Sequence, residues 1–312
     1  MGYRFSSRKK IIRKAFEESE ALRQLRAFLD ENEPGLVYWL VNTWRTQGKA
    51  ITYKELREAI LAGDISWDIL QEWQQDYAAF VRDHLYPKWM DAMEAATARL
   101  EERYPDWYFD PMADGVREWA ENRSAAFVTE VTDTQIEGIR AVVFRAAVME
   151  DMTVDQLARA IRPMVGLTHP QAMANLKYYE KLIEKGASEK KALDLSTRYA
   201  ARQHRYRGYN IARTELAFSY NQGAHMGIKQ AQEKGYMGET VKIWSTANDE
   251  RVCKICGGLH KTQVGMDEEF DFPTRLADPG IRLTPPAHPS CRCAVMYKEI
   301  GPPINPSTYE TT

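Results

Sequence analysis

The chain has 312 residues, of which 44% are hydrophobic, and its formal net charge is −2 at pH 7. This length allows two domains or one elongated body, and the hydrophobic content is sufficient for a buried core. The near-neutral charge gives no support to strong, charge-driven binding of nucleic acid by the chain as a whole. No apolar run approaches the ~20 residues that are needed to cross a bilayer.

The N-terminus is strongly basic, because its first fourteen residues carry six lysines and arginines and no acidic residue. Acidic residues follow this segment, where a signal peptide would have an apolar stretch. We therefore expect a protein that is made in the cytosol and used or assembled there. The basic segment is either a solvated, mobile end or a tether to phosphate or to an acidic partner.

The first third of the chain is expected to be helical. Apolar residues keep helical spacing over Phe16–Leu29, and Pro34 followed by glycine predicts the end of that helix. Thr52 begins a predicted capping box, Ser66 is a predicted N-cap, and Pro87 predicts a kink or restart. Seven of the eight tryptophans precede residue 120. They indicate either a thin bundle that buries large aromatic side chains or a protein–protein interface.

Helices resume after a linker that ends near residue 112. Thr153 and Thr168 each begin a predicted capping box. Gly186 predicts a helix end, and Ser188 is expected to cap a long helix that reaches about Lys234.

Short strands are predicted at 241–243 and 295–297 from their alternating apolar residues. The resulting fold class is mainly α, with an elongated helical body and a small α+β C-terminal domain that resembles a zinc knuckle. The predicted regions are an aromatic-rich helical region at 1–110, a helical core at 111–238, a small Cys/His cluster domain at 239–300 and a proline-rich tail at 301–312.

Four arginines of the long helix fall within a sector of about 80°, because successive helical residues are about 100° apart. We call them the arginine stripe: Arg198, Arg202, Arg205 and Arg213. His204 and Arg207 lie beside the stripe. Such a stripe faces nucleic-acid phosphates or an acidic protein surface, or else it is an ordinary solvated face with local ion pairs.

All four cysteines lie within one forty-one-residue stretch near the C-terminus. Cys253 and Cys256 have knuckle spacing, which lets both sulfurs and the intervening N–H groups converge on one ion. Cys291 and Cys293 form the second pair, shortly after His288. Two close pairs of soft ligands predict a structural zinc site that closes the loop between them.

Local disulfides and reduced thiols in a small core are the alternatives to a metal. A reducing cytosol disfavours disulfides. A catalytic zinc is disfavoured because four thiols and an imidazole leave no open coordination position. His260 is a further, weaker candidate ligand. The expected ligands are Cys253, Cys256 and Cys291, with either Cys293 or His288 in the fourth place.

Several motifs in chain order resemble the phage head morphogenesis family, also called Mu F-like minor head proteins. The resemblance covers roughly residues 125–297, and the second and fourth motifs are specific when they occur together. The motifs are Gly166-Leu-Thr-His-Pro-Gln-Ala172, Ile211-Ala-Arg-Thr-Glu215, Asp249-Glu-Arg-Val-Cys-Lys-Ile-Cys256 and Pro285-Pro-Ala-His-Pro-Ser-Cys-Arg-Cys293. Ser290 departs from the family, which often has asparagine there.

The resemblance implies a low-copy minor capsid protein of a tailed bacteriophage. Its implied partner is the portal protein. The family also allows three further partners, which are scaffold protein, major capsid protein and packaged DNA. The DNA would be bound without sequence preference. The implied location is the capsid interior near the portal, after assembly in the host cytoplasm. The implied roles are head morphogenesis, genome packaging and DNA delivery, with no membrane involved.

Arg213 and Glu215 point about 100° apart on a helix, so they cannot share one small catalytic site unaided. We interpret both as structural, ion-paired to Asp249 or Arg251. No histidine makes a convincing metal-plus-base pair, and we expect no enzymatic activity. The alternative function is a zinc-dependent DNA-binding module or nuclease, which would use the cysteine cluster and the arginine stripe.

Overall fold

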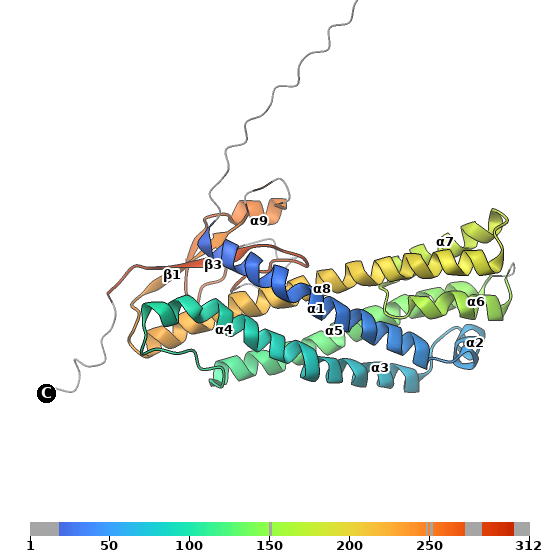
Figure 1. Ribbon diagram of the computed structural model, residues 1–312, viewed down its shortest axis with the longest axis horizontal. Coiled ribbons are helices and arrows are strands. Elements are labelled where there is room, and N and C mark those ends of the chain that lie inside the picture. The colour runs from blue at the N-terminus through green and yellow to red at the C-terminus, as the bar shows by residue number, and fades with distance from the viewer. Residues whose placement is uncertain (1–18, 150–151, 248, 250–251, 272–282, 303–312) are drawn as a thin grey trace, which may run out of the picture.

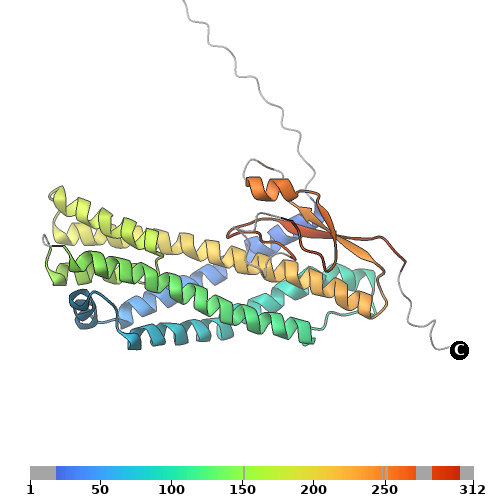
Figure 2. The same ribbon diagram turned by 180° about the vertical axis from the view of Figure 1, so that it is seen from behind.

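The computed structural model describes residues 19–149, 152–247, 249, 252–271 and 283–302. Long helices form an elongated bundle, and a small sheet packs near one end of it (Figure 1, and from behind in Figure 2). The predicted fold class, a mainly α elongated body with a small α+β region that carries the cysteines, is confirmed. The basic N-terminal segment and most of the proline-rich tail lie outside the described residues.

The bundle is built from long helices joined by short turns and helical kinks. In chain order these are α1 (Glu20–Ala50), α2 (Tyr53–Ala62), α3 (Trp67–Phe80), the π-helix η1 (Val81–Leu85), α4 (Tyr86–Arg103), α5 (Asp114–Ala147), α6 (Val154–Ile161), the 3₁₀-helix η2 (Arg162–Met164), α7 (His169–Glu184) and α8 (Glu189–Glu233). No described helix combines the length and the apolar character that crossing a bilayer requires.

The C-terminal region is a small antiparallel sheet with one short helix. Its elements are β1 (Thr240–Ser245), α9 (Lys254–Leu259), β2 (Gln263–Gly265) and β3 (Ala294–Glu299), and the strand order is β2-β1-β3. Both predicted strands are confirmed, as the inner and one outer strand. β2 was not predicted, because three residues carry too little alternation to be recognised.

Local capping chemistry sets several helix starts. Thr52, Thr153 and Thr168 each form the predicted capping box. Ser188 accepts a hydrogen bond from Lys191 N and begins α8, as predicted. Ser66 occupies the predicted N-cap position of α3, although its side chain makes no capping hydrogen bond.

The predicted helix end at Pro34 is wrong, because α1 continues through Pro34 to Ala50. The proline lies on the exposed side, where water can satisfy the carbonyl that loses its N–H partner. The apolar spacing continues past it through Leu36, Leu40 and Trp44, all of which are buried. Their burial outweighs the cost of an interior proline, which is about 3 kcal/mol.

The restart predicted at Pro87 takes the form of a π-turn. η1 immediately precedes α4, and Pro87 is the second residue of α4. A proline near a helix start loses little, because the first N–H groups of a helix have no intrahelical partner. The extra residue of the π-turn lets Leu85 and Trp89 both remain buried.

α8 is the spine against which the other parts pack. It crosses α4 closely at Gly223, where any Cβ would overlap the Met93 backbone. It approaches α1 at Gly208, where a Cβ would lie 3.2 Å from Val37 Cγ1. Four of the seven early tryptophans are buried within this body, as the aromatic-bundle interpretation requires, and two are exposed. The buried ones are Trp44, Trp73, Trp89 and Trp107, and the exposed ones are Trp39 and Trp67.

His204 is a buried polar residue of α8. Its ring stacks on Trp44 with centroids 5.5 Å apart, and its Nε2 lies 2.8 Å from the Val165 carbonyl oxygen. A carbonyl only accepts, so Nε2 carries the proton. Burial lowers the pKa of His204 to about 4; the hydrogen bond to Val165 opposes this shift, and the nearby Arg207 and Arg45 reinforce it.

This depressed pKa predicts a loss of stability in acid. The unfolded chain takes up a proton near pH 6.5 that folded His204 excludes, so stability falls with pH between about 6.5 and 4. At pH 5 the loss amounts to about 2 kcal/mol. His204→Gln keeps a donor for Val165 and does not titrate. Between pH 7.5 and 5, the unfolding free energy of the unmodified chain in urea should therefore fall by about 2 kcal/mol more than that of His204→Gln. His169→Gln, at an exposed position, is the control and should behave like the unmodified chain. If His204→Gln lost as much stability in acid as the unmodified chain, the prediction would be contradicted.

Candidate metal centre

The cysteine cluster forms where α9 meets the segment that leads into β3. Cys253 is the N-cap of α9, and its sulfur accepts a hydrogen bond from Cys256 N at 3.4 Å. This is the local geometry in which backbone N–H groups stabilise a knuckle thiolate. Cys291 and Cys293 come from the segment just before β3, which returns beside α9.

All five predicted ligands are brought together. The His288 Nε2 lies 3.2 Å from Cys253 Sγ and 3.3 Å from Cys256 Sγ, and the Cys256 and Cys291 sulfurs are 3.7 Å apart. The five form two overlapping triads that share Cys256, each with its ligand atoms within 4.8 Å of one another. The four cysteines are free thiols, so the disulfide interpretation does not hold in this structure.

The orientation of His288 suits a metal ligand. Its Nδ1 lies 2.9 Å from the Pro289 carbonyl oxygen. Because that oxygen can only accept, Nδ1 carries the proton and the lone pair of Nε2 faces the sulfurs. A backbone carbonyl that fixes the tautomer of a histidine is the usual outer support of a metal-bound imidazole.

The electrostatics of the cluster favour one thiolate held by neighbouring thiols, because the hydrogen bond that lowers the pKa of Cys291 raises the pKa of Cys256. Hydrogen bonds from the Cys256 and Cys293 thiols hold the pKa of Cys291 well below its ordinary value. Burial alone would raise the pKa of the Cys253 thiol, but the Cys256 N–H and His288 together lower it. Thiolates are the form of cysteine that binds metal.

The space between the ligands is small and lies at the edge of an apolar cluster. The cavity they line is about 30 Å³. Trp244, Phe270 and Val295 are buried around the sulfurs. Four ligands around one ion would leave no room for substrate in such a space, which is the arrangement of a structural site rather than a catalytic one.

The ligand segment is fastened to α8 by side chains that sequence reasoning did not single out. Ser290 N donates to Thr214 Oγ1 at 2.9 Å, and Ser290 Oγ lies 2.7 Å from Asn210 Oδ1. Further along, Asn221 donates to the Cys293 carbonyl oxygen at 3.3 Å and accepts from Val295 N at 3.0 Å. The metal-ligand segment is therefore held by the helical body at both ends.

Ser290 has a backbone φ of 59°, in the left-handed region. Asparagine adopts this conformation more readily than serine. The conformation gives a physical reason for asparagine at this position in related sequences. Here the Ser290 hydroxyl compensates by its hydrogen bond to Asn210.

His260, the weaker candidate, is not part of the cluster. Its Nδ1 accepts a hydrogen bond from Thr246 N at 3.2 Å, in the turn after β1. It supports the sheet edge and lies outside both ligand triads.

The arginine stripe divides into two parts. Arg198, Arg202 and Arg205 are exposed on α8, and Arg198 pairs with Asp194 one turn away. Arg213 instead makes two hydrogen bonds to the buried Glu33 of α1, at 2.7 and 2.8 Å. Three of the four side chains therefore remain on an open surface.

The ion-pair partners predicted for Arg213 and Glu215 are wrong. Arg213 pairs with Glu33, and Glu215 pairs with Arg123 of α5. Asp249 pairs with Arg292, while Arg251 lies outside the described residues. Both acidic partners in these pairs are nearly fully buried, so the actual pairs join α8 to the other helices of the bundle.

Thr214 offers a direct test of the tether. Thr214→Val removes the acceptor of Ser290 N and should cost about 1 kcal/mol of local stability. We expect the cysteines of the metal-free protein to react faster with a thiol reagent such as Ellman's reagent. Thr129→Val is the matched control, because Thr129 makes only the same i−4 bond that Thr214 makes to Asn210. Unchanged thiol reactivity in Thr214→Val would show that the tether does not hold the cluster.

The amino-acid sequence matches one known family. The family model described as Phage Mu protein F like protein matches residues 137–296, about half of the chain, from within α5 to β3. No curated protein and no solved structure gives a significant match. The matched segment contains the tether residues of α8 and all five candidate ligands, and the resemblance found in the sequence is confirmed. The chain belongs to the family of phage Mu protein F-like proteins.

Proposed function

We propose that this phage head protein acts as a minor capsid component that binds the portal inside the head. The observation that carries the proposal is the family match over residues 137–296. On this proposal the protein is assembled in the host cytoplasm, takes part in head morphogenesis and genome packaging or delivery, and has scaffold or major capsid protein as further neighbours. The long, rigid α8 spine suits a part that holds other components at fixed positions.

The metal centre supports a structural role over a catalytic one. Cys256 and Cys291 are buried in a small apolar cluster, and His288 is already oriented toward the sulfurs by its hydrogen bond to Pro289. A nuclease would need an open coordination position and a positioned base. The arginine stripe gives the DNA-binding alternative little support, because Arg213 is committed to Glu33 and Arg198 to Asp194.

We propose zinc as the metal, held by Cys253, Cys256, Cys291 and His288. Tetrahedral zinc with bonds near 2.3 Å places two sulfurs about 3.8 Å apart, close to the 3.7 Å between Cys256 and Cys291. His288 contacts the sulfurs of Cys253 and Cys256 directly and forms a triad with Cys253, the thiol that the triad of Cys256, Cys291 and Cys293 lacks. Cys293 would then be a neighbour of the ligand sulfurs.

Metal analysis of the purified chain tests this assignment. We expect about one zinc per chain by elemental mass spectrometry, and strong loss of zinc in Cys256→Ser, because Cys256 belongs to both triads. His288→Ala should lose zinc and Cys293→Ser should retain it. His260→Ala is the matched histidine control and should retain it fully.

The reverse pattern is zinc retained in His288→Ala and lost in Cys293→Ser. It would show that Cys293, not His288, is the fourth ligand. A chain that lacks zinc and folds equally well with a chelator present would contradict the metal proposal. The family assignment would stand in either case.

Portal association is tested with the portal protein encoded in the same phage genome. We expect the chain to co-sediment with purified portal rings and not with an unrelated ring-shaped protein of similar size. The unrelated ring is the control for non-specific adhesion. Binding to neither, together with normal genome packaging in a deletion phage, would contradict the proposed function.

A further inference from the structure

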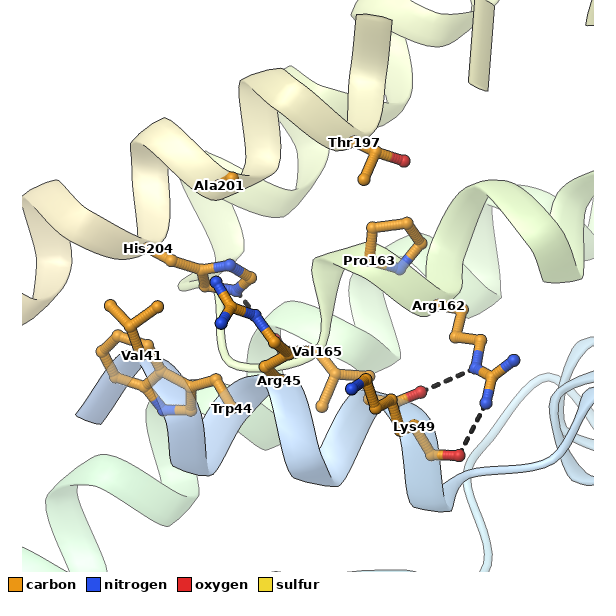
Figure 3. Close-up of a pocket in the computed structure, with 11 residues that line it drawn as sticks. Val41, Trp44, Arg45, Lys49, Arg162, Pro163, Val165, Thr197, Ala201 and His204 are labelled. Atoms are coloured by element: carbon orange, nitrogen blue, oxygen red, sulfur yellow. Dashed lines mark hydrogen bonds between the residues drawn. The ribbon is translucent and has the colours of Figure 1, made fainter. Parts of the chain in front are cut away.

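A second concave site lies at the opposite half of α8 from the metal centre. Its cavity of about 300 Å³ opens between α1, α8 and η2, which places it at the small end of the range for ligand pockets (Figure 3). The side chains from the three elements converge on it, as Figure 3 shows. The lining residues are Val41, Trp44, Arg45, Gly48, Lys49, Arg162, Pro163, Val165, Thr197, Ala201 and His204.

The floor of this pocket is apolar and firmly held. Trp44 is 1% exposed, and its Nε1 donates to the buried Tyr77 hydroxyl at 2.7 Å. On its other side the indole packs against the His204 ring and the Arg207 guanidinium. His204 is in turn bonded to Val165. These contacts fix the pocket floor before any ligand arrives, which lowers the entropic cost of binding.

The rim of the pocket is cationic. Arg45, Lys49 and Arg162 line it, and no acidic residue does. Arg162 is occupied in part, because it donates to the Gly48 and Lys49 carbonyl oxygens at 2.7 and 2.6 Å. Over the described ranges of the chain, neither Arg45 nor Lys49 pairs with a carboxylate. Figure 3 shows the Arg45 side chain reaching toward His204.

The exposed part of the arginine stripe extends this rim along α8. Arg205 lies one turn after the pocket residue Ala201, and helical side chains lean toward the helix N-terminus, so Arg205 covers the surface next to Ala201. Arg202 is also exposed, and its guanidinium lies over the Tyr199 ring. Arg205 thus adds a cation beside the pocket, whereas Arg202 lies with Tyr199, which packs against Tyr178 of α7.

We propose that this pocket is the docking site for an acidic segment of a partner protein that inserts one apolar side chain between Val41, Pro163 and Ala201, above the buried Trp44. Carboxylates on both sides of the inserted side chain would pair with Arg45, Lys49 and Arg205. A ligand that fills the apolar floor and also pairs with the cationic rim needs one apolar group with acidic groups on both sides of it.

A protein segment fits this chemistry better than nucleic acid does. Duplex DNA offers phosphates to the rim, but it can place an apolar group in a concave pocket only by extruding a base, which costs a few kcal/mol, about 2–5. An acidic peptide supplies the apolar group without that cost. The inference is independent of the partner's identity, so it can fail while the portal proposal stands.

The test uses the full chain and synthetic probes. The first probe is a fluorescein-labelled peptide of alternating glutamate and serine with one central phenylalanine, and the second has alanine in the central place. A labelled duplex of random sequence is the third. Binding is followed by fluorescence anisotropy for the unmodified chain, Arg45→Glu, Ala201→Trp and Lys298→Glu. Lys298 is exposed on β3, at the other end of the molecule, and controls for the change in net charge.

We expect the phenylalanine peptide to bind at least about tenfold more tightly than the alanine peptide. Arg45→Glu reverses one rim charge and should weaken it about tenfold, with steep dependence on salt. Ala201→Trp fills the pocket from α8 and should weaken the phenylalanine peptide to the level of the alanine peptide. Lys298→Glu should stay within about twofold. Thermal unfolding of each variant confirms that the fold is intact.

Three results would overturn the proposal. The first is the absence of saturable binding by the phenylalanine peptide. The second is equal binding of both peptides, which would show that the pocket accepts no side chain. The third is that the duplex binds more tightly than the phenylalanine peptide and that Arg45→Glu abolishes this binding. That result would assign the surface to nucleic acid.

Discussion

Three consecutive residues in one turn of α8 connect this helix to three other parts of the molecule, because their side chains point in three different directions. Arg213 reaches α1 through Glu33, Thr214 holds the metal-ligand segment through Ser290, and Glu215 reaches α5 through Arg123. The steps of about 100° that prevent these neighbours from forming one catalytic site let each fasten a different part. Loss of one member of a buried ion pair typically costs about 3–5 kcal/mol, so the position of α8 is strongly fixed.

The metal centre depends on this turn as much as on its own ligands. A three-stranded sheet with a six-residue helix has too little apolar area to be stable alone. Two devices compensate for the small core. The cysteine cluster can close the chain between α9 and β3, and Asn221 and Thr214 bind the closed segment to a helix that is already ordered. A metal would stabilise the local fold, and the helix would set its position.

Features that depend on neighbouring residues could be predicted from the sequence. The capping boxes, both main strands, the limits of α8 and the gathering of five ligands follow from short spacing rules. The continuation of α1 past Pro34 could not be predicted, because it rests on packing against a helix far along the chain. The partners of Arg213 and Glu215 were missed for the same reason: a helical face shows that a charge is present, but the opposite charge lies in a distant element.

The positions of the two sites on α8 suggest how such a protein would work without chemistry. The pocket residues Thr197–His204 and the tether residue Thr214 lie on one uninterrupted helix, ten to seventeen residues apart, a separation of about 15–25 Å. α1 lines the pocket through Arg45 and contacts the tether turn through Glu33, so both helices span the two sites. A partner bound at the pocket would thus be held at a fixed distance and orientation from the end that carries the cysteine cluster. Fixed spacing between two attachment points is the property that an assembly component needs, and two helices joined by a partly buried ion pair provide it.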